Sequence, residues 1–248
     1  MKVKIIKDPT TRPLRRENGE IDFYAFENVP TNINRLKKNA NLNVTPDGYA
    51  AIGPIDWLAF NTKSGKTADV NVRRAIAHAI DRNFILKAIM LGVADEARTG
   101  IHPGSPYYEP NVEAYDIDID KANKILDDAG YKKGSDGMRF GLNVDFGWPG
   151  LRPNAEYTKA ALKKIGIDVT VRQSADFPTW AQTVSNHNFD LTWDTVFNWG
   201  DPVIGVHRTY QTSNIKKGVI WSNTQQYSNP KVDAIMEKAG VENDMAKR

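Results

Sequence analysis

The chain has 248 residues, 40% of them hydrophobic and 25% charged, a composition typical of a globular protein with a substantial core. Its net charge of +3 is small and the basic residues are spread along the sequence, which argues against a nucleic-acid-binding surface. Because cysteine is absent, disulfides and thiolate catalysis are excluded, and no apolar run reaches the roughly 18 residues that a membrane-spanning helix needs.

The first 55 residues alternate short strand and helix patterns, as in an α/β layer. They are charged at the start and hold no apolar segment of the kind found in signal peptides. The expected elements are strands over 2–7, 21–26 and 42–44, helices over 9–18 and 31–39, and a loop over 46–54.

Residues 56–92 read as a packed unit with one apolar side. A strand is predicted over 57–61, and Asp69 stands where the N-cap of a following helix is expected. In that helix the apolar residues recur at steps of three and four and therefore share one face. Asp81 is in position to cap a second helix, which Gly92 would end.

The rest of the chain continues the alternation of helices and strands after a loop rich in proline and glycine over 98–110. Its helices are expected over 118–129, 153–165, 177–186 and from 230 onward, and its strands over 138–146, 167–171 and 189–197. The last eight residues read as the start of a further helix. The pattern predicts an α/β fold.

Two short motifs resemble ligand-binding loops, one for phosphate and one for calcium, but each lacks a residue that its loop requires. Gly65-Lys66-Thr67 lies between a strand and a helix like a phosphate loop, but Phe60 stands where that loop needs glycine, which leaves a solvated polar turn. Three alternating aspartates from Asp116 resemble the opening of a calcium loop, but Lys121 replaces its essential glycine. Asp118 is therefore expected to cap a helix.

The sequence also lacks the spacing of a metal or nucleophilic site. The four histidines, at 78, 102, 187 and 207, show no ligand spacing, and no G-x-S-x-G elbow is present. We therefore expect neither a metal nor another cofactor, and His78 is interpreted as a structural residue.

The unit over 56–92 carries a family resemblance. Its "FN" strand end followed by a "D-x-x-V-R-x-A-I-x-x-A-I-D-R" helix pair resembles the peptide/nickel-type (family 5) extracellular solute-binding proteins of ABC importers. The matching residues here are Phe60, Asn61, Asp69, Val72, Arg73, Ala75, Ile76, Ala79, Ile80, Asp81 and Arg82. Further elements match from Asp118 to Tyr131 and from Asn229 to Ile235, so the resemblance covers nearly the whole chain.

The resemblance implies a periplasmic-binding-protein-like lobe, with a mixed sheet flanked by helices, plus part of a second lobe. Residues 1–55 would be the C-terminal part of lobe I, 56–230 the ligand-binding lobe II, and 231–248 a truncated C-terminal helical segment. Family members are longer, so the chain is expected to correspond to the second half of such a protein. The family works in the periplasm or outside the cell, beside a membrane permease.

The segment from Trp193 to Arg208 is the predicted binding site. Aromatic and polar side chains gather at and beyond a strand end, where α/β folds open their ligand crevices. Rings would hold the apolar part of a solute while polar groups orient it. The candidate residues are Trp57, Trp193, Phe197, Asn198, Trp199, Asp201 and Arg208, with Tyr107 and Tyr108 as further candidates. An alternative places Trp193 in the core.

By resemblance, this segment lines the cleft, and peptide-binding members have an aspartate a few residues before the "DP" dipeptide. Asn198 lies nearest that position here, ahead of Asp201 and Pro202. An asparagine accepts a hydrogen bond but carries no charge.

The resemblance implies a non-enzymatic protein that binds a peptide-like or similar small solute between two lobes and delivers it to the permease subunits of an ABC importer. The alternative is a carbohydrate-active enzyme or lectin-like module built on the same tryptophan-rich segment, with the carboxylates of Asp190, Asp194 or Asp201. If one lobe is incomplete, exposed apolar surface is expected to drive self-association of the chain.

Overall fold

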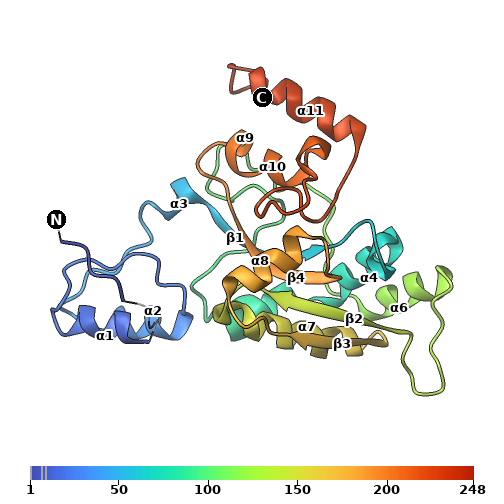
Figure 1. Ribbon diagram of the computed structural model, residues 1–248, viewed down its shortest axis with the longest axis horizontal. Helices are drawn as coiled ribbons and strands as arrows, with labels where there is room; N and C mark the ends of the chain where they lie inside the picture. Colours follow the sequence, from blue (N-terminus) through green and yellow to red (C-terminus); the bar gives the residue numbers. More distant parts are fainter. Residues whose placement is uncertain (1, 7, 9) are drawn as a thin grey trace. The chain divides into compact units, whose positions relative to one another are not determined.

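The computed structural model describes residues 2–6, 8 and 10–248, and it divides the chain into two compact units. The first unit runs to Asp47 and includes Asn83–Asp95; the second comprises Gly48–Arg82 and Glu96–Arg248 (Figure 1). The lobe boundaries expected from the sequence at residues 55 and 230 stay predictions. No helix of the described residues has both the length and the apolar character needed to cross a bilayer.

The part of the first unit that ends at Asp47 contains two short helices among its described residues, α1 (Thr11–Glu17) and α2 (Pro30–Leu36). A salt bridge of 2.7 Å joins Arg35 of α2 to Glu17 of α1. Both helices were expected, although residue 9, the predicted start of the first, lies outside the described residues.

The three strands predicted in the first unit are wrong for the residues described there. Residues 2–6, 21–26 and 42–44 form neither helix nor strand, and residue 7 lies outside the described part. A strand pattern becomes a strand only when a neighbouring backbone takes its hydrogen bonds. The apolar side chains that suggested strands are instead exposed, Ile5 at 89% and Phe23 at 82%.

The second helix of the 56–92 motif is present in a different form. A single turn, α5 (Arg82–Phe84), passes into a π-helix, η2 (Ile85–Ile89). The N–H of Met90 donates to the carbonyl of Ile85, five residues back, across 2.8 Å. Gly92, at φ +74°, follows as expected of a helix stop.

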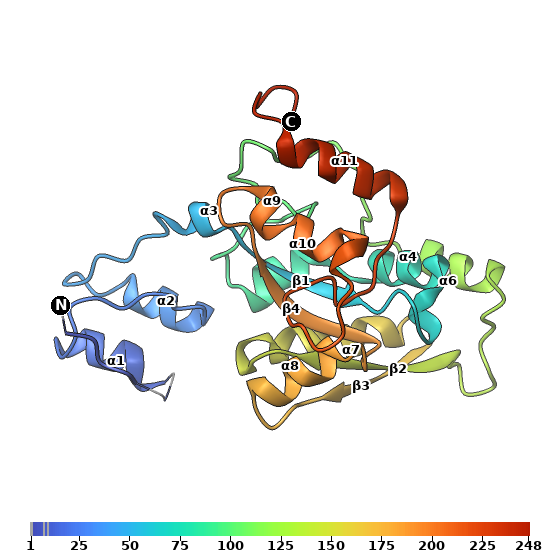
Figure 2. The same ribbon diagram turned by 45° about the horizontal axis from the view of Figure 1, so that its top comes forward.

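The second unit is built on a four-stranded sheet in the order β1-β4-β2-β3. Its strands are β1 (Pro54–Phe60), β2 (Phe140–Phe146), β3 (Ile167–Arg172) and β4 (Leu191–Phe197). The β1 strand is antiparallel to β4, whereas β2 is parallel to both β3 and β4. This confirms the mixed α/β sheet, which Figure 2 shows from a second direction.

The two faces of this sheet differ in polarity. One face carries Trp193 and other apolar residues, and the indole of Trp193 donates to Thr158 of α7 (Arg152–Lys163) across 2.9 Å. The other face carries polar residues, including Thr192, which accepts a bond of 3.0 Å from the indole of Trp180 in α8 (Phe177–Ser185). The alternation follows from the two-residue period of a strand.

The remaining helices of the second unit begin mostly at side-chain caps. Asp69 caps α4 (Val70–Ala79) and Asp118 caps α6 (Ile119–Asp128), each accepting a backbone N–H bond of 2.8 Å, as predicted. The other helices are α3 (Tyr49–Ile52), α9 (Pro202–Gly205), α10 (His207–Tyr210) and α11 (Pro230–Val241), with short 3₁₀ turns η1 (Lys66–Ala68), η3 (Pro149–Leu151) and η4 (Thr212–Asn214).

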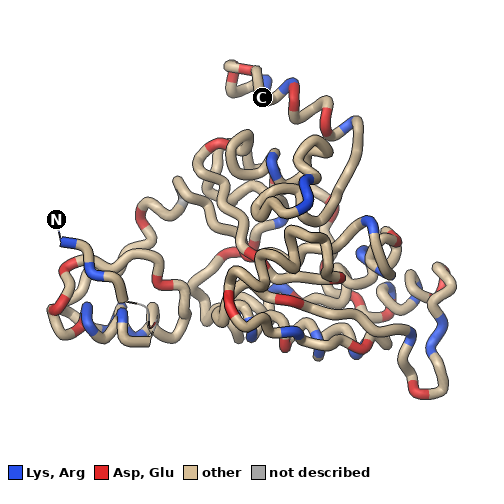
Figure 3. The backbone as a smooth tube through the Cα atoms, viewed as in Figure 1, with Lys and Arg blue, Asp and Glu red and all other residues tan. Residues whose placement is uncertain are grey.

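Two smaller expectations are corrected. The helix expected over the last eight residues is wrong, because α11 ends at Val241 and only turns follow. The turn at Gly65-Lys66-Thr67 is not fully solvated, since the Thr67 side chain is buried and its hydroxyl donates to the carbonyl of Asn61 across 2.7 Å. Basic and acidic residues are interspersed in both units (Figure 3).

Candidate ligand-binding site

The backbone turns sharply where β4 ends, and it does so in an unusual conformation. Trp199 and Gly200 both lie in the left-handed region, at φ +56° and +77°. This region is costly for a bulky residue and is found mostly where the surroundings impose it. The N–H of Trp199 donates to the carbonyl of Ile52 across 3.0 Å, which holds the turn against the end of α3.

The turn presents an aromatic pair at the surface. The rings of Phe197 and Trp199 lie 5.4 Å apart at an angle of 32°, and Trp199 is 49% exposed. A planar or apolar group could stack on such an exposed ring.

Two glycines pack closely against the backbone of Asn198. A Cβ atom on Gly53 would lie 2.9 Å from the Cβ of Asn198 and 3.0 Å from that of His102. A Cβ atom on Gly205 would lie 2.5 Å from the Cα of Asn198. Only glycine fits at these two positions without movement of the neighbouring chain, so the end of β4 is held from both sides.

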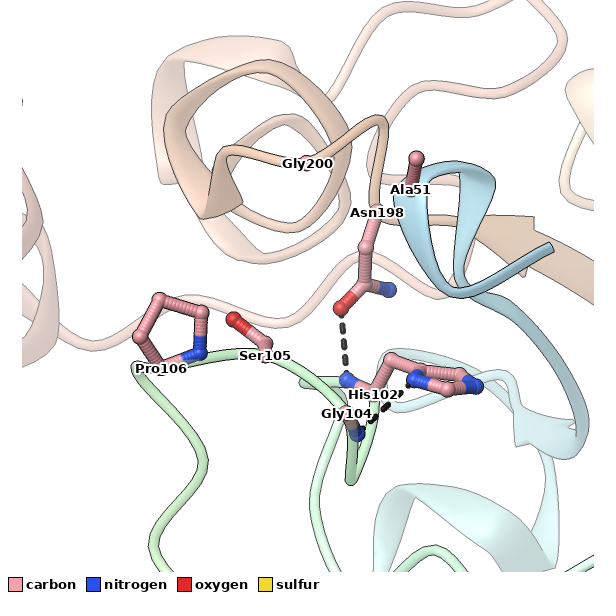
Figure 4. Close-up of a pocket in the computed structure, with 7 residues that line it drawn as sticks. All are labelled: Ala51, His102, Gly104, Ser105, Pro106, Asn198 and Gly200. Carbon is pink, nitrogen blue, oxygen red and sulfur yellow. Dashed lines mark hydrogen bonds between the residues drawn. The ribbon is translucent and has the colours of Figure 1, made fainter. Parts of the chain in front are cut away.

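The side chain of Asn198 binds the loop that follows residue 98. Its Oδ1 accepts from the N–H of His102 across 2.6 Å, and its Nδ2 donates to the carbonyl of Gly100 across 3.2 Å. Asn198 is 3% exposed, so these bonds lie in a largely desolvated environment. Figure 4 shows the bond to His102.

A pocket of about 210 Å³ opens between this loop and the end of β4. In Figure 4 the loop residues lie on one side of it, facing Gly200 and Asn198. The lining residues are Ala51, His102, Gly104, Ser105, Pro106, Asn198 and Gly200. Pockets for whole drug-sized ligands start at roughly 300 Å³, so this one accommodates a single functional group or side chain.

Two polar side chains of the pocket accept hydrogen bonds from backbone N–H groups of their own loop. Nδ1 of His102 accepts a bond of 3.0 Å from the N–H of Gly104, which leaves the proton of the neutral ring on Nε2. The hydroxyl of Ser105 accepts a bond of 3.3 Å from the N–H of Tyr107 and keeps its own O–H to donate. The pocket therefore offers hydrogen-bond donors to a ligand.

Asp201, which was predicted to bind the solute, lies beyond the turn, and its carboxylate already binds other groups of the protein. Its carboxylate caps α9 by accepting from the N–H of Val203 across 2.9 Å. The same oxygen forms a salt bridge of 2.5 Å with Arg248, whose guanidinium lies over the ring of Tyr107.

Trp57 and Arg208 lie near the buried carboxylate of Asp194 and do not line the pocket. Trp57 is opposite Asp194 in the β1–β4 register, on the polar face, and its ring packs against Tyr210 of α10. Asp194 is 5% exposed, and burial raises its pKa to about 7. The N–H of Thr195 and the guanidinium of Arg208 lower that pKa, whereas the Asp56 carboxyl raises it further.

Trp193 lies on the opposite face of the sheet, in the core. It is 5% exposed and bonds to Thr158, as the alternative interpretation of the sequence had it. Of the seven predicted residues, Asn198 alone is among the residues that line the pocket, while Phe197 and Trp199 form the aromatic pair on either side of it in the sequence.

The carboxylates considered for glycoside hydrolysis are individually occupied. Asp190 accepts from the backbone and side-chain nitrogens of Asn143, across 2.9 and 3.1 Å, while Asp194 is buried. Among the described residues no group of three or more His, Asp or Glu side chains is placed to hold a metal ion.

Sequence reasoning missed the loop side of the pocket. His102 and Ser105 belong to the segment over 98–110, from which only Tyr107 and Tyr108 were candidates for solute binding. The contact between His102 and Asn198 spans 96 positions of sequence and leaves no local pattern. The density of proline and glycine in that segment was the available signal of a functional loop.

The chain is similar in sequence to known solute-binding proteins. Heme-binding protein A of Haemophilus influenzae is 27% identical over 252 residues, covering 96% of this chain and 42% of its own length. The Dipeptide-binding protein of Escherichia coli is 27% identical over 168 residues, which is 67% of this chain and 31% of that protein. The chain therefore spans less than half the length of these relatives.

Solved structures show the same fold. The periplasmic binding protein DppA from Helicobacter pylori, in complex with the peptide STSA, superposes with a TM-score of 0.84 at 24% identity, over 99% of this chain and 46% of DppA. NikZ from Campylobacter jejuni, in complex with Ni(L-His), gives a TM-score of 0.80 at 23% identity, over 99% of this chain and 49% of NikZ.

The sequence profile described as "Bacterial extracellular solute-binding proteins, family 5 Middle" matches residues 1–218. Proteins of this family serve ABC importers of peptides, nickel or heme and are not enzymes. Because the match covers most of the sequence, the chain belongs to the family 5 bacterial extracellular solute-binding proteins.

Proposed function

We propose that this chain is the solute-binding component, or a large part of it, of an ABC importer for a peptide-like or similar small solute. The observation that carries the proposal is a pocket at the end of β4, in a chain whose family match spans residues 1–218. The relatives supply the class of ligand: the H. pylori structure holds a peptide and the C. jejuni structure holds a nickel–histidine complex.

Binding would use both parts of the site. A polar group of the solute enters the pocket between His102 and Asn198, and an adjacent apolar or planar part lies against Trp199. Because the turn at Trp199 is fixed by Gly53 and Gly205 through Asn198, little ordering remains to be done when the solute arrives.

The pocket would form one wall of a cleft between two lobes. A solute that contacts both lobes favours the closed form, because only differential affinity for the two forms shifts the equilibrium between them. The closed form would then be recognised by the permease subunits on the periplasmic or extracellular side of the membrane. No chemical change of the solute is required at any step.

Retention of peptides by the intact 248-residue chain tests the proposal. The chain is incubated with a mixture of short peptides, exchanged into volatile buffer and measured by native mass spectrometry. Trp199→Ala should lower retention at least about tenfold, the loss expected when one aromatic wall is removed.

Trp221→Ala is the matched control. Trp221 is also an exposed tryptophan in the left-handed region, at φ +54°, but its ring packs against Phe177 of α8. Retention should be unchanged in this variant. Equal losses in the two variants, or no retention by the unmodified chain, would contradict the proposed site.

A further inference from the structure

The electrostatic character of the pocket narrows the class of solute. None of its seven lining residues is Asp, Glu, Lys or Arg. Its one histidine, His102, uses Nδ1 to accept a hydrogen bond from the N–H of Gly104. A charged group entering this pocket would lose hydration without meeting an opposite charge.

Asn198 does not supply the missing polarity for a cation. Its Oδ1 already accepts from the N–H of His102, and its Nδ2 already donates to Gly100. The nearest carboxylate along the chain, that of Asp201, is taken by the N–H of Val203 and by Arg248. An ammonium group in the pocket would therefore meet no carboxylate among the lining residues, and the charge of Asp201 is already paired with Arg248.

Two donors remain among the side chains that line the pocket. The Nε2–H of His102 and the O–H of Ser105 are not used by the hydrogen bonds described above. Two neutral donors suit a carbonyl or hydroxyl oxygen, which accepts hydrogen bonds and carries no charge.

We propose that this pocket selects an uncharged, oxygen-bearing group of the solute, such as an amide carbonyl or a hydroxyl, and discriminates against a primary ammonium. This inference rests on the proposed solute-binding function and specifies which end of a solute the pocket takes. A peptide would enter by an internal amide or a blocked terminus and would keep its free amine elsewhere.

A competition between two forms of the same peptides tests the inference on the intact chain. Short peptides with amidated C-termini are prepared with a free α-amine and with an acetylated one, mixed in equal amounts, and their retention is compared by native mass spectrometry. The acetylated forms should be retained about tenfold more. That ratio corresponds to a difference of about 1.4 kcal/mol in binding free energy. Tighter retention of the free-amine forms would overturn the inference and leave the binding function intact.

A pair of variants at Ala51 shows whether the preference arises in this pocket. Ala51 is an exposed lining residue on α3, so a polar side chain there adds to the pocket without removing a described hydrogen bond. Ala51→Asp should shift retention toward the free-amine peptides about tenfold relative to Ala51→Asn, which adds similar volume without charge. An equal preference in the two variants would overturn the inference, and failure of every form to bind would remove the proposed function with it.

Discussion

The side chain of Asn198 accepts a hydrogen bond from the backbone N–H of His102 across 2.6 Å and joins the end of β4 to a loop 96 positions earlier in the sequence. The same two residues meet Gly53, where an added Cβ would be 2.9 and 3.0 Å from their Cβ atoms. The pocket wall is thus made by three segments that hold one another in place.

Removal of the Asn198 amide should loosen this wall and destabilise the fold. In Asn198→Ala the N–H of His102 and the carbonyl of Gly100 lose their described side-chain partner. The expected loss of unfolding free energy is about 2 kcal/mol, the typical cost of leaving buried polar groups unpaired. Urea unfolding followed by tryptophan fluorescence measures it.

Asn198→Asp is the informative companion, because one carboxylate oxygen can still accept from His102 while the other faces the carbonyl of Gly100. We expect a loss of similar size. A loss below about 0.5 kcal/mol in both variants, the range of ordinary surface substitutions, would contradict the assigned role.

Gly205 should tolerate no side chain. A Cβ atom there would clash with the carbonyl oxygen of Phe197 and lie 2.5 Å from the Cα of Asn198, both of them main-chain atoms. Gly205→Ala should lower the unfolding free energy by about 3 kcal/mol or more, since the backbone must shift in a tightly packed region.

The control for this substitution is Gly240→Ala. Gly240 lies in α11 with nothing within 4 Å of an added Cβ, so alanine should stabilise the helix by up to about 1 kcal/mol. Both changes can be read from thermal unfolding. Comparable melting temperatures for the two variants would show that the close approach at Gly205 is relieved at little cost.

Trp193 and Trp199 should respond in opposite ways to replacement by phenylalanine. Trp193→Phe removes a buried indole that bonds to Thr158, so stability should fall by about 1–3 kcal/mol while solute retention stays unchanged. Trp199→Phe changes an exposed ring, so retention should fall more than stability. Unfolding curves and native mass spectrometry on the same samples separate the two effects, and a loss of retention in Trp193→Phe alone would contradict this assignment.

Much of the second unit could be predicted from local sequence, because its signals are local. Asp69 and Asp118 predicted the helices that they cap. The two-residue period of a strand puts Asp194 and Trp193, which are neighbours in β4, on opposite faces. The first unit shows the limit of such patterns. Residues 21–26 have the composition of a strand, but a strand requires a partner backbone, and the pattern of one segment carries no information about its neighbours.

The side of the pocket at the end of β4 could be predicted from the sequence. The opposite side, formed by the loop over 98–110, could not. Asn198, which lines the pocket, was among the predicted residues because polar and aromatic residues follow a strand end. Two properties depend on long-range contacts: the occupation of the Asn198 amide by His102 and Gly100, and the capture of Asp201 by Arg248. Both change what these side chains can do for a ligand, and neither could be inferred before the chain was folded.

Self-association of the chain is expected to depend on concentration. The first unit exposes apolar side chains that a stable monomer would ordinarily cover, among them Ile5 and Phe23. Size-exclusion chromatography between roughly 1 and 100 μM should show a shift toward larger species, as expected for a weak apolar association. Ile5→Thr combined with Phe23→Ser should reduce the shift, and a single monomer peak throughout would contradict the expectation.

Stability should depend on pH through Asp194. Burial raises the pKa of its carboxyl from 3.8 to about 7 in the folded chain, while the unfolded chain keeps the lower value. Above pH 7 the carboxyl is ionised in both states and folding carries the cost of burying the charge. Between pH 7 and 4 the folded state binds the proton first, so stability rises as the pH falls, by up to about 1.4 kcal/mol per pH unit.

Asp194→Asn isolates this contribution, because asparagine has nearly the same shape and no charge to bury. Titrating groups that do not interact with Asp194 affect both proteins alike, so the difference between their unfolding free energies reports Asp194 together with its coupling to Asp56. As the pH is raised from 5 to 8, the unfolding free energy of the variant should increase relative to that of the wild type. This difference should level off above the pKa of Asp194 in the folded chain. Urea midpoints at each pH provide the measurement, and a difference that stays constant from pH 5 to 8 would show that the buried carboxyl titrates with an ordinary pKa.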